Sequence, residues 1–136
     1  RYAPTFIQMG HQLTFDQIHQ AIVRGVREAE SQYPMAVGLI ATVQRILPVA
    51  EGKKVIDFAI ANKDTFVGVD LADNEEGFDS KPFAPLFLKA QEAGLGITIH
   101  SGEAPHPKAP KWVMDAVEVL HAVRIGHGVQ IIHNQD

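Results

Sequence analysis

The stretch GLGITIHSGEAPHP, which spans residues 94–107, shows how the chain is built. Gly94 is placed to end a helix, and the apolar run after it is short enough for a buried strand that stops at His100. Glu103 comes three residues later, in a loop that contains prolines. A helix end, a short apolar strand and a polar loop in this order are typical of one unit of a parallel α/β sheet.

The same unit recurs along the chain at intervals of about 30 residues, which is the size of one strand–helix repeat. Thr14, with Gln17 three residues later, matches the pattern of a helix capping box. The first four residues, RYAP, could be the end of an earlier strand. The expected helices span residues 13–33, 49–63, 81–94 and 111–122, and the expected strands span 35–43, 64–72 and 95–100, with a fourth that begins at 123.

Two architectures fit this alternation of strands and helices: a doubly wound open sheet and a (β/α)8 barrel. A barrel needs about 200 residues or more, so in that case units are missing at both ends of these 136 residues. No linker or low-complexity segment divides the chain. We therefore predict an α/β fold in which residues 1–136 form a single domain.

The composition excludes several classes of protein. The formal net charge is −4 and no run of lysine or arginine occurs, so the basic surface of a nucleic-acid-binding protein is not expected. Cysteine is absent, so any metal would have to rely on histidine and carboxylate ligands. No apolar stretch reaches the roughly 18 residues of a membrane span, and no signal peptide is visible. We expect a cytoplasmic protein with neither nucleic acid nor a membrane as its partner.

Ionisable side chains follow three successive apolar strands, at His100, at His127 and at Asp70. Ligands of parallel α/β folds bind at these strand ends, and an unpaired buried polar group there would cost about 1–3 kcal/mol. His100 could be a zinc ligand or a hydrogen-bonded core histidine. Glu103 could be a general acid or base or a solvated loop carboxylate. His127, between two glycines, could approach a substrate or simply lie in a turn.

The other ionisable residues have simpler interpretations. Asp70 could orient a ligand or satisfy backbone donors, and the structural role is favoured. The acidic loop that contains Asp73, Glu75, Glu76 and Asp79 is most simply solvated, although it could line a polar rim over a site. No functional role is expected for the remaining histidines, which are His11, His19, His106, His121 and His133.

The motifs at the strand ends resemble those of the adenosine deaminase family, within the metal-dependent amidohydrolase barrels. TIHSGE, residues 98–103, is similar to that family's T-x-H-A-G-E strand end, and VRIGHGV, 123–129, is similar to its R-x-G-H-G strand. VDLADNEEGF, 69–78, is similar to its D-L-A-G-D-E strand, and RYAP and the region of Arg45 are similar to earlier strand ends. The resemblance implies that the chain holds roughly strands 3 to 7 of a TIM-type barrel.

The resemblance also implies a mechanism, in which Zn²⁺ activates a water that attacks C6 of a purine nucleoside and ammonia leaves. His100 would be a metal ligand, Glu103 would deliver a proton to the purine N1, and His127 would orient the attacking hydroxide. Zinc lowers the pKa of bound water to about 7, which makes hydroxide available near neutral pH.

Two departures from the family pattern affect this expectation. The family's other metal ligands, an H-x-H pair on the first strand and an aspartate on the eighth, are not among these residues, so we expect this segment alone to bind zinc weakly or not at all. Asp73 replaces the family's glycine that contacts the purine, and Ser101 replaces an alanine. Asp73 is therefore a candidate substrate-binding residue. Adenosine is the leading substrate; adenine, another purine-derived substrate and a scaffold without metal remain alternatives, and the oligomeric state stays open.

Overall fold

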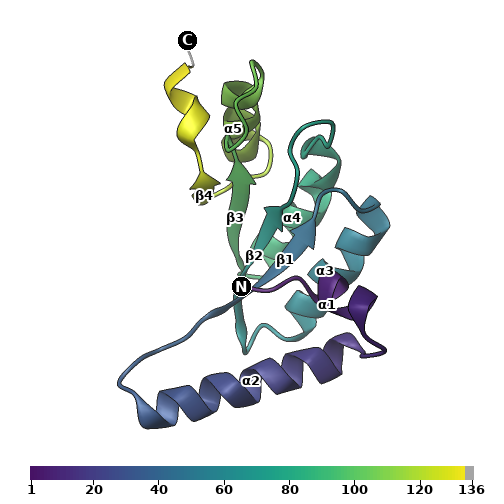
Figure 1. Cartoon of the computed structure of the whole chain (residues 1–136), viewed down its shortest axis with the longest axis vertical. Helices are drawn as coiled ribbons and strands as arrows, with labels where there is room; N and C mark the ends of the chain where they lie inside the picture. Colours follow the sequence, from purple (N-terminus) through teal and green to yellow (C-terminus); the bar gives the residue numbers. More distant parts are fainter. Residues whose placement is uncertain (134–136) are drawn as a thin grey trace.

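The computed structural model describes residues 1–133, so the last three residues of the expected 1–136 domain lie outside the described part. Its centre is a parallel sheet of β1 (Leu39–Gln44), β2 (Phe66–Ala72), β3 (Gly96–Ser101) and β4 (Arg124–His127). These strands lie in the order β1-β2-β3-β4, each beside its predecessor in the sequence (Figure 1). A doubly wound sheet would reverse its strand order partway across, whereas this order is that of a barrel wall. The prediction of a partial barrel is thus confirmed over its doubly wound alternative.

The beginning of the chain extends the sheet by one more partner. Tyr2 forms a parallel bridge with Ala41. The Tyr2 amide donates to the carbonyl of Ile40 at 3.2 Å, and the Thr42 amide donates to the carbonyl of Tyr2 at 2.8 Å. The expectation that RYAP ends an earlier strand is therefore confirmed at Tyr2.

Helices connect the strands in the expected places. They are α2 (Phe15–Gln32), α3 (Val49–Ala61), α4 (Ala84–Glu92), which follows a 3-10 turn η1 (Lys81–Phe83), and α5 (Ala109–Glu118). The capping box of α2 is confirmed, because the Thr14 hydroxyl accepts from the Gln17 amide and the Gln17 side chain accepts from the Thr14 amide. None of the described helices is long and apolar enough to cross a membrane.

Alternation along the strands separates an apolar face from a polar one. The apolar face packs against α3, α4 and α5, while Figure 1 shows α2 lying across the amino-terminal ends of the strands. The buried residues of this face are Leu39, Ala41, Val43, Val69, Leu71, Ile97 and Ile99. Since successive side chains of a strand point to opposite faces, the residues between them face the other way. Thr42, Asp70 and Thr98, which lie side by side in the strand register, form a polar row on that inner face.

Several element boundaries differ from the expected ones by one to four residues, and one helix was not expected. The first helix, α1 (Pro4–Gly10), was not predicted, although Pro4 lies in its first turn, where a proline is well tolerated. The first strand begins at Leu39 and not at residue 35. The fourth strand ends at His127 because His127 and Gly128 both have positive φ angles, of 67° and 68°, and a second 3-10 turn, η2 (Val129–His133), follows.

Candidate active site

The ends of β3 and β4 place three of the predicted site residues together. The rings of His100 and His127 have centroids 5.3 Å apart with an angle of 61° between their planes. Ser101 pairs with His127 in the strand register, so His100, the next-to-last residue of β3, and His127, the last residue of β4, lie at the carboxyl ends of adjoining strands. The loop after β3 returns Glu103 to the same place, with Oε2 at 3.3 Å from Nε2 of His127. The two imidazoles and the carboxylate therefore converge on one point above the sheet.

A buried carboxylate orients the His100 ring. Oδ1 of Asp70, which is fully buried, lies 2.9 Å from Nδ1 of His100. An ionised carboxylate can only accept, so Nδ1 carries the proton and Nε2 presents its lone pair. This is the arrangement that carboxylates give to metal-binding histidines. Asp70 thus orients a candidate ligand, and the purely structural role favoured from the sequence is too narrow.

The Arg1 side chain contacts both Asp70 and His100. Its Nη1 lies 2.9 Å from Oδ2 of Asp70 and 2.9 Å from Nε2 of His100. The guanidinium is a donor only, which again makes Nε2 an acceptor. A metal ion at Nε2 would have to displace the Arg1 guanidinium.

Arg45 is a buried residue whose side chain contacts His100. It was not predicted as a site residue, although the family resemblance includes its region. The residue is 4% exposed, and Nη2 donates to the carbonyl oxygen of His100. Burial lowers the pKa of the Arg45 guanidinium, and the carboxylates of Glu75 and Asp70 oppose this shift most strongly. Its Nε atom has no hydrogen-bond partner among the described residues. Arg45 therefore lies in a buried environment whose charge is balanced by the carboxylates of β2 and the loop that follows it.

Glu75 is the clearest error of the sequence-based interpretation. It was expected to be solvated, yet it is only 7% exposed. Its carboxylate accepts four hydrogen bonds, one from the Ser101 hydroxyl at the end of β3 and three from backbone amides of the loop that follows, which contains Glu103. The other acidic residues of its loop, Asp73, Glu76 and Asp79, are exposed as expected.

Asp73 lies at the rim of a cavity beside the three site residues. This cavity has a volume of about 290 Å³, and its lining is Asp73, Asn74, Glu75, His100, Glu103 and Ala104. The backbone of Asp73 has a φ of 86°, in the left-handed region that favours glycine. Its carboxylate accepts from Nε2 of Gln44 at 3.0 Å and from the amide of Asn74 at 2.9 Å. The acidic loop thus does line a polar rim, through Asp73.

The described residues provide one donor that suits zinc, His100. His100 offers Nε2 from an oriented neutral ring, which is the form that binds zinc. No group of three or more histidine, cysteine or acidic side chains that could hold a metal occurs within residues 1–133. The described residues therefore supply one suitable ligand, and a complete site would need donors from elsewhere in the protein.

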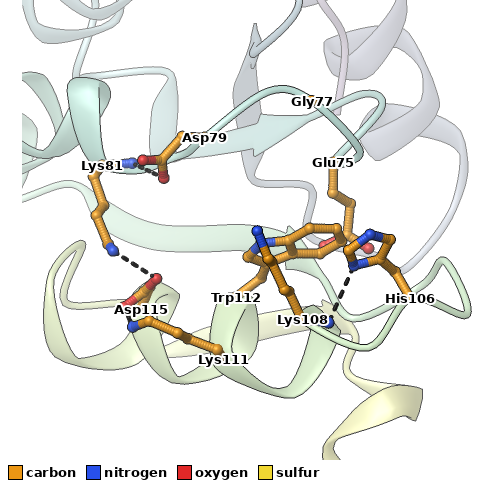
Figure 2. A pocket seen from close by; sticks show the side chains of 9 residues that line it. All are labelled: Glu75, Gly77, Asp79, Lys81, His106, Lys108, Lys111, Trp112 and Asp115. Atoms are coloured by element: carbon orange, nitrogen blue, oxygen red, sulfur yellow. Dashed lines mark hydrogen bonds and ion pairs between the residues drawn. The ribbon is translucent and has the colours of Figure 1, made fainter.

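A second pocket adjoins the first, since Glu75 lines both. Its volume is about 510 Å³, and Figure 2 shows the nine residues around it. The rings of His106 and Trp112 stack with centroids 4.7 Å apart. Asp115 accepts from Lys111 at 2.8 Å and pairs with Lys81 at 3.1 Å. Burial alone would raise the pKa of Asp115, but these two ammonium groups outweigh it and the pKa is lowered.

The fold and the site together define the class of protein. A consecutive parallel sheet with helices packed on one face, and with imidazoles and carboxylates at the carboxyl ends of its strands, is part of a (β/α)8 barrel of the amidohydrolase type. A solved amidohydrolase from Burkholderia ambifaria with bound zinc superposes with a TM-score of 0.90 at 28% identity, over 98% of this chain and 36% of that one.

Sequence comparison identifies the family. The adenosine deaminase family model matches residues 1–136. The chain is 36% identical over 138 residues to the adenosine deaminase of Plasmodium falciparum (isolate 3D7), which covers all of this chain and 37% of that protein. It is 33% identical over 135 residues to the adenosine deaminase of Escherichia coli O1:K1, covering 99% of this chain and 40% of that protein. The chain therefore belongs to the adenosine deaminase family, and it spans about two fifths of the length of these curated relatives.

Proposed function

We propose that the protein containing this chain is a cytoplasmic, zinc-dependent enzyme that hydrolyses adenosine to inosine and ammonia. We further propose that residues 1–136 form part of its single barrel domain. The observation that supports this function most is the convergence of His100, Glu103 and His127 at adjoining strand ends of a chain of this family. Each of the three side chains has a position suited to one part of the reaction.

His100 would hold the metal through Nε2, because Asp70 binds Nδ1 and keeps the ring turned towards the open side. When bound, zinc supplies a Lewis acid that lowers the pKa of water to about 7. Adenosine would therefore meet a water oxygen that is ready to add to C6 at neutral pH.

Glu103 would donate a proton to N1 of the purine as the water oxygen adds to C6. Protonation of N1 prevents negative charge from building up on the ring while C6 becomes tetrahedral. The C6–N bond then breaks as the amino group takes up the proton that the added oxygen releases, so ammonia leaves and the C6 carbonyl of inosine forms. His127 would orient the attacking oxygen and stabilise its charge, and its Nε2 is close enough to the Glu103 carboxylate to form a hydrogen-bonded pair with it.

A second substrate class is favoured by Asp73. A side chain at this position places a carboxylate on the rim of the cavity that His100 and Glu103 also line. A carboxylate there would crowd an unmodified purine nucleoside or accept a hydrogen bond from it. Adenine or another purine-derived substrate is therefore the alternative to adenosine.

The test is the substitution Glu103→Gln in the full-length protein loaded with zinc. We expect kcat for adenosine to fall by roughly 10²- to 10⁴-fold, which is the usual contribution of a general acid, while the bound zinc is unchanged. Glu118→Gln, the same change on the exposed surface of α5, is the matched control and should leave kcat unchanged. The decrease in ultraviolet absorbance of the purine measures the reaction.

The outcomes separate the alternatives. Full activity in Glu103→Gln would disprove the acid role of Glu103. Turnover of adenine but not of adenosine by the unmodified protein would favour the second substrate class. A full-length protein without zinc and without activity on either purine would indicate a scaffold that has lost the metal site.

A further inference from the structure

We propose that Glu75 is a positioning residue for the reaction, which acts by holding the loop that contains Glu103. This inference rests on the proposed function, because it assigns the role through Glu103. Glu75 lies in the loop after β2, and the loop it binds follows β3, so it connects two neighbouring strand ends. It does not need to touch a substrate to act in this way.

The contacts use the whole capacity of the carboxylate. Oε2 accepts from the Ser101 hydroxyl at 3.1 Å and from the Gly102 amide at 2.7 Å. Oε1 accepts from the Glu103 amide at 2.7 Å and from the Ala104 amide at 3.2 Å. Three consecutive backbone N–H groups thus point at one anion, which is the arrangement of an anion-binding nest. Hydrogen bonds to an ionised acceptor are about twice as strong as neutral ones.

The loop has a further backbone contact, because the Gly102 carbonyl accepts from the Gln130 amide at 3.0 Å, but the amides of residues 102–104 all donate to Glu75. The Glu103 side chain is 67% exposed, and its contact in the described structure is with His127. Its direction therefore depends on the backbone of residues 102–104. Gly102 has a φ of 72°, and a Cβ there would lie 2.5 Å from Val113, so the backbone turns tightly against α5 at this point. The carboxylate of Glu75 fixes the N–H group of this turn residue and those of the two residues that follow it.

The Glu75 side chain is largely shielded from solvent, since the residue is only 7% exposed. Figure 2 shows the Glu75 side chain extending from its loop towards the stacked His106 and Trp112 rings. Its negative charge is balanced by the buried guanidinium of Arg45, which also donates to the carbonyl of His100. Glu75 is thus an oriented, shielded anion, and a neutral side chain of the same shape cannot replace it.

Glutamine illustrates the requirement. Its amide has one accepting oxygen, so its NH₂ group must face either the Ser101 and Gly102 donors or the Glu103 and Ala104 donors. The Ser101 hydroxyl can turn to accept, but the Gly102 amide cannot. In either orientation at least one backbone N–H loses its acceptor and faces another N–H, and the loop has to move. A displacement of about 1 Å at a catalytic group can cost about 100-fold in rate.

The experiment is a double-mutant cycle in the zinc-loaded full-length protein with Glu75→Gln, Glu103→Gln and the combination. We expect Glu75→Gln to lower kcat for adenosine by roughly 10- to 100-fold with KM changed by less than about threefold. In the Glu103→Gln background the same change should cost less than about twofold, because the group that it positions is already disabled. Glu76→Gln, the same change at the exposed neighbouring residue, should leave kcat unchanged.

If the fold decrease in kcat of the combined variant equals the product of the decreases in the two single variants, the proposal is overturned. A purely structural role of Glu75 would act independently of Glu103 and would give this product. If Glu75→Gln does not fold, Glu75→Asp enters the same cycle and is judged by the same criterion. Amide hydrogen exchange provides a readout that does not need activity. Gly102 and Glu103 should lose protection by at least about tenfold in the Glu75 variant, and unchanged protection overturns the proposal. An inactive wild-type protein would count against the proposed function, while exchange at these amides would still decide whether Glu75 holds the loop.

Discussion

The glycine that faces His100 should not tolerate even one additional methyl group. In Gly126→Ala the new Cβ would lie 2.8 Å from Cδ2, 2.9 Å from Cγ and 3.0 Å from Nε2 of the His100 ring. Carbon atoms in ordinary contact are about 3.5 Å apart, so the ring or the strand must yield by roughly 0.7 Å. The ring cannot move without disturbing its 2.9 Å hydrogen bond to Asp70, and β4 cannot move without disturbing its pairing with β3.

Two opposing terms give the expected magnitude. Overpacking of a well-packed site costs about 1–3 kcal/mol, whereas replacing glycine by alanine within a strand returns about 0.5–1 kcal/mol. The free energy of unfolding should therefore decrease by up to about 2.5 kcal/mol, with about 1 kcal/mol at the midpoints of the two ranges, which is a factor of about 5 in the unfolding equilibrium. Displacement of the His100 ring should also weaken zinc binding by roughly 10- to 100-fold.

Urea unfolding and zinc titration of the full-length protein measure these two effects. Gly25→Ala is the matched control, because Gly25 is exposed in α2 and an added Cβ would meet nothing within 4 Å. This control should raise the free energy of unfolding by about 0.5–1 kcal/mol through better helix propensity. Equal stability and equal zinc affinity of Gly126→Ala and the wild type would show that the His100 ring is not confined between Gly126 and Asp70.

Two further predictions concern stability and substrate preference. Burial lowers the pKa of His19, so its contribution to stability should be complete above the unfolded pKa of about 6.5 and lost as the pH falls towards the lower folded pKa. The urea midpoint of His19→Gln should therefore vary less with pH below about 6.5 than that of the wild type, whereas the exposed control His11→Gln should follow the wild type. Parallel curves for all three proteins would contradict this prediction. Asp73→Gly removes the strain of a side chain at a positive φ angle and removes a carboxylate from the cavity rim. The kcat/KM for adenosine should then rise by roughly tenfold relative to that for adenine. An unchanged ratio would show that Asp73 does not contact the base.

The positions of the strands and of their ends are well predicted from the sequence, because they depend on local patterns. Short apolar runs and the positions of His100 and His127 were sufficient to place two imidazoles at adjoining strand ends, and the structure brings them together. The capping residues Thr14 and Gln17 were equally readable, since a capping box is a contact within one turn. The proposed catalytic and metal-binding roles of His100, Glu103 and His127 remain predictions, because proximity does not demonstrate chemistry.

The supporting residues were harder to predict because their partners are distant in the sequence. Glu75 belongs to an acidic loop whose composition indicates a solvated segment, and only the fold brings the amides of residues 102–104 to its carboxylate. His19 is a similar case: its Nδ1 lies 2.7 Å from the Tyr2 hydroxyl and its Nε2 lies 2.8 Å from Oγ1 of Thr65. The Thr65 hydroxyl donates to the carbonyl of Asn62, so it accepts from Nε2–H, and Nδ1 of the neutral ring, whose pKa burial lowers, accepts from the Tyr2 hydroxyl. No functional role was expected for His19, and these contacts make it a buried structural residue.

The charged side chains around β3 are better explained by positioning than by stability. Asp70 holds the ring of His100, Arg45 holds its carbonyl oxygen, and Glu75 holds the amide of Glu103. Buried ion pairs generally contribute little to stability, because the desolvation of each charge offsets their attraction, and apolar side chains of similar volume are often at least as stable. Apolar side chains, however, could not fix a ring nitrogen, a carbonyl and an amide in chosen directions. A purely structural role does not require the desolvation of three charges at the end of one strand. The orientation of His100 and Glu103 accounts for their presence.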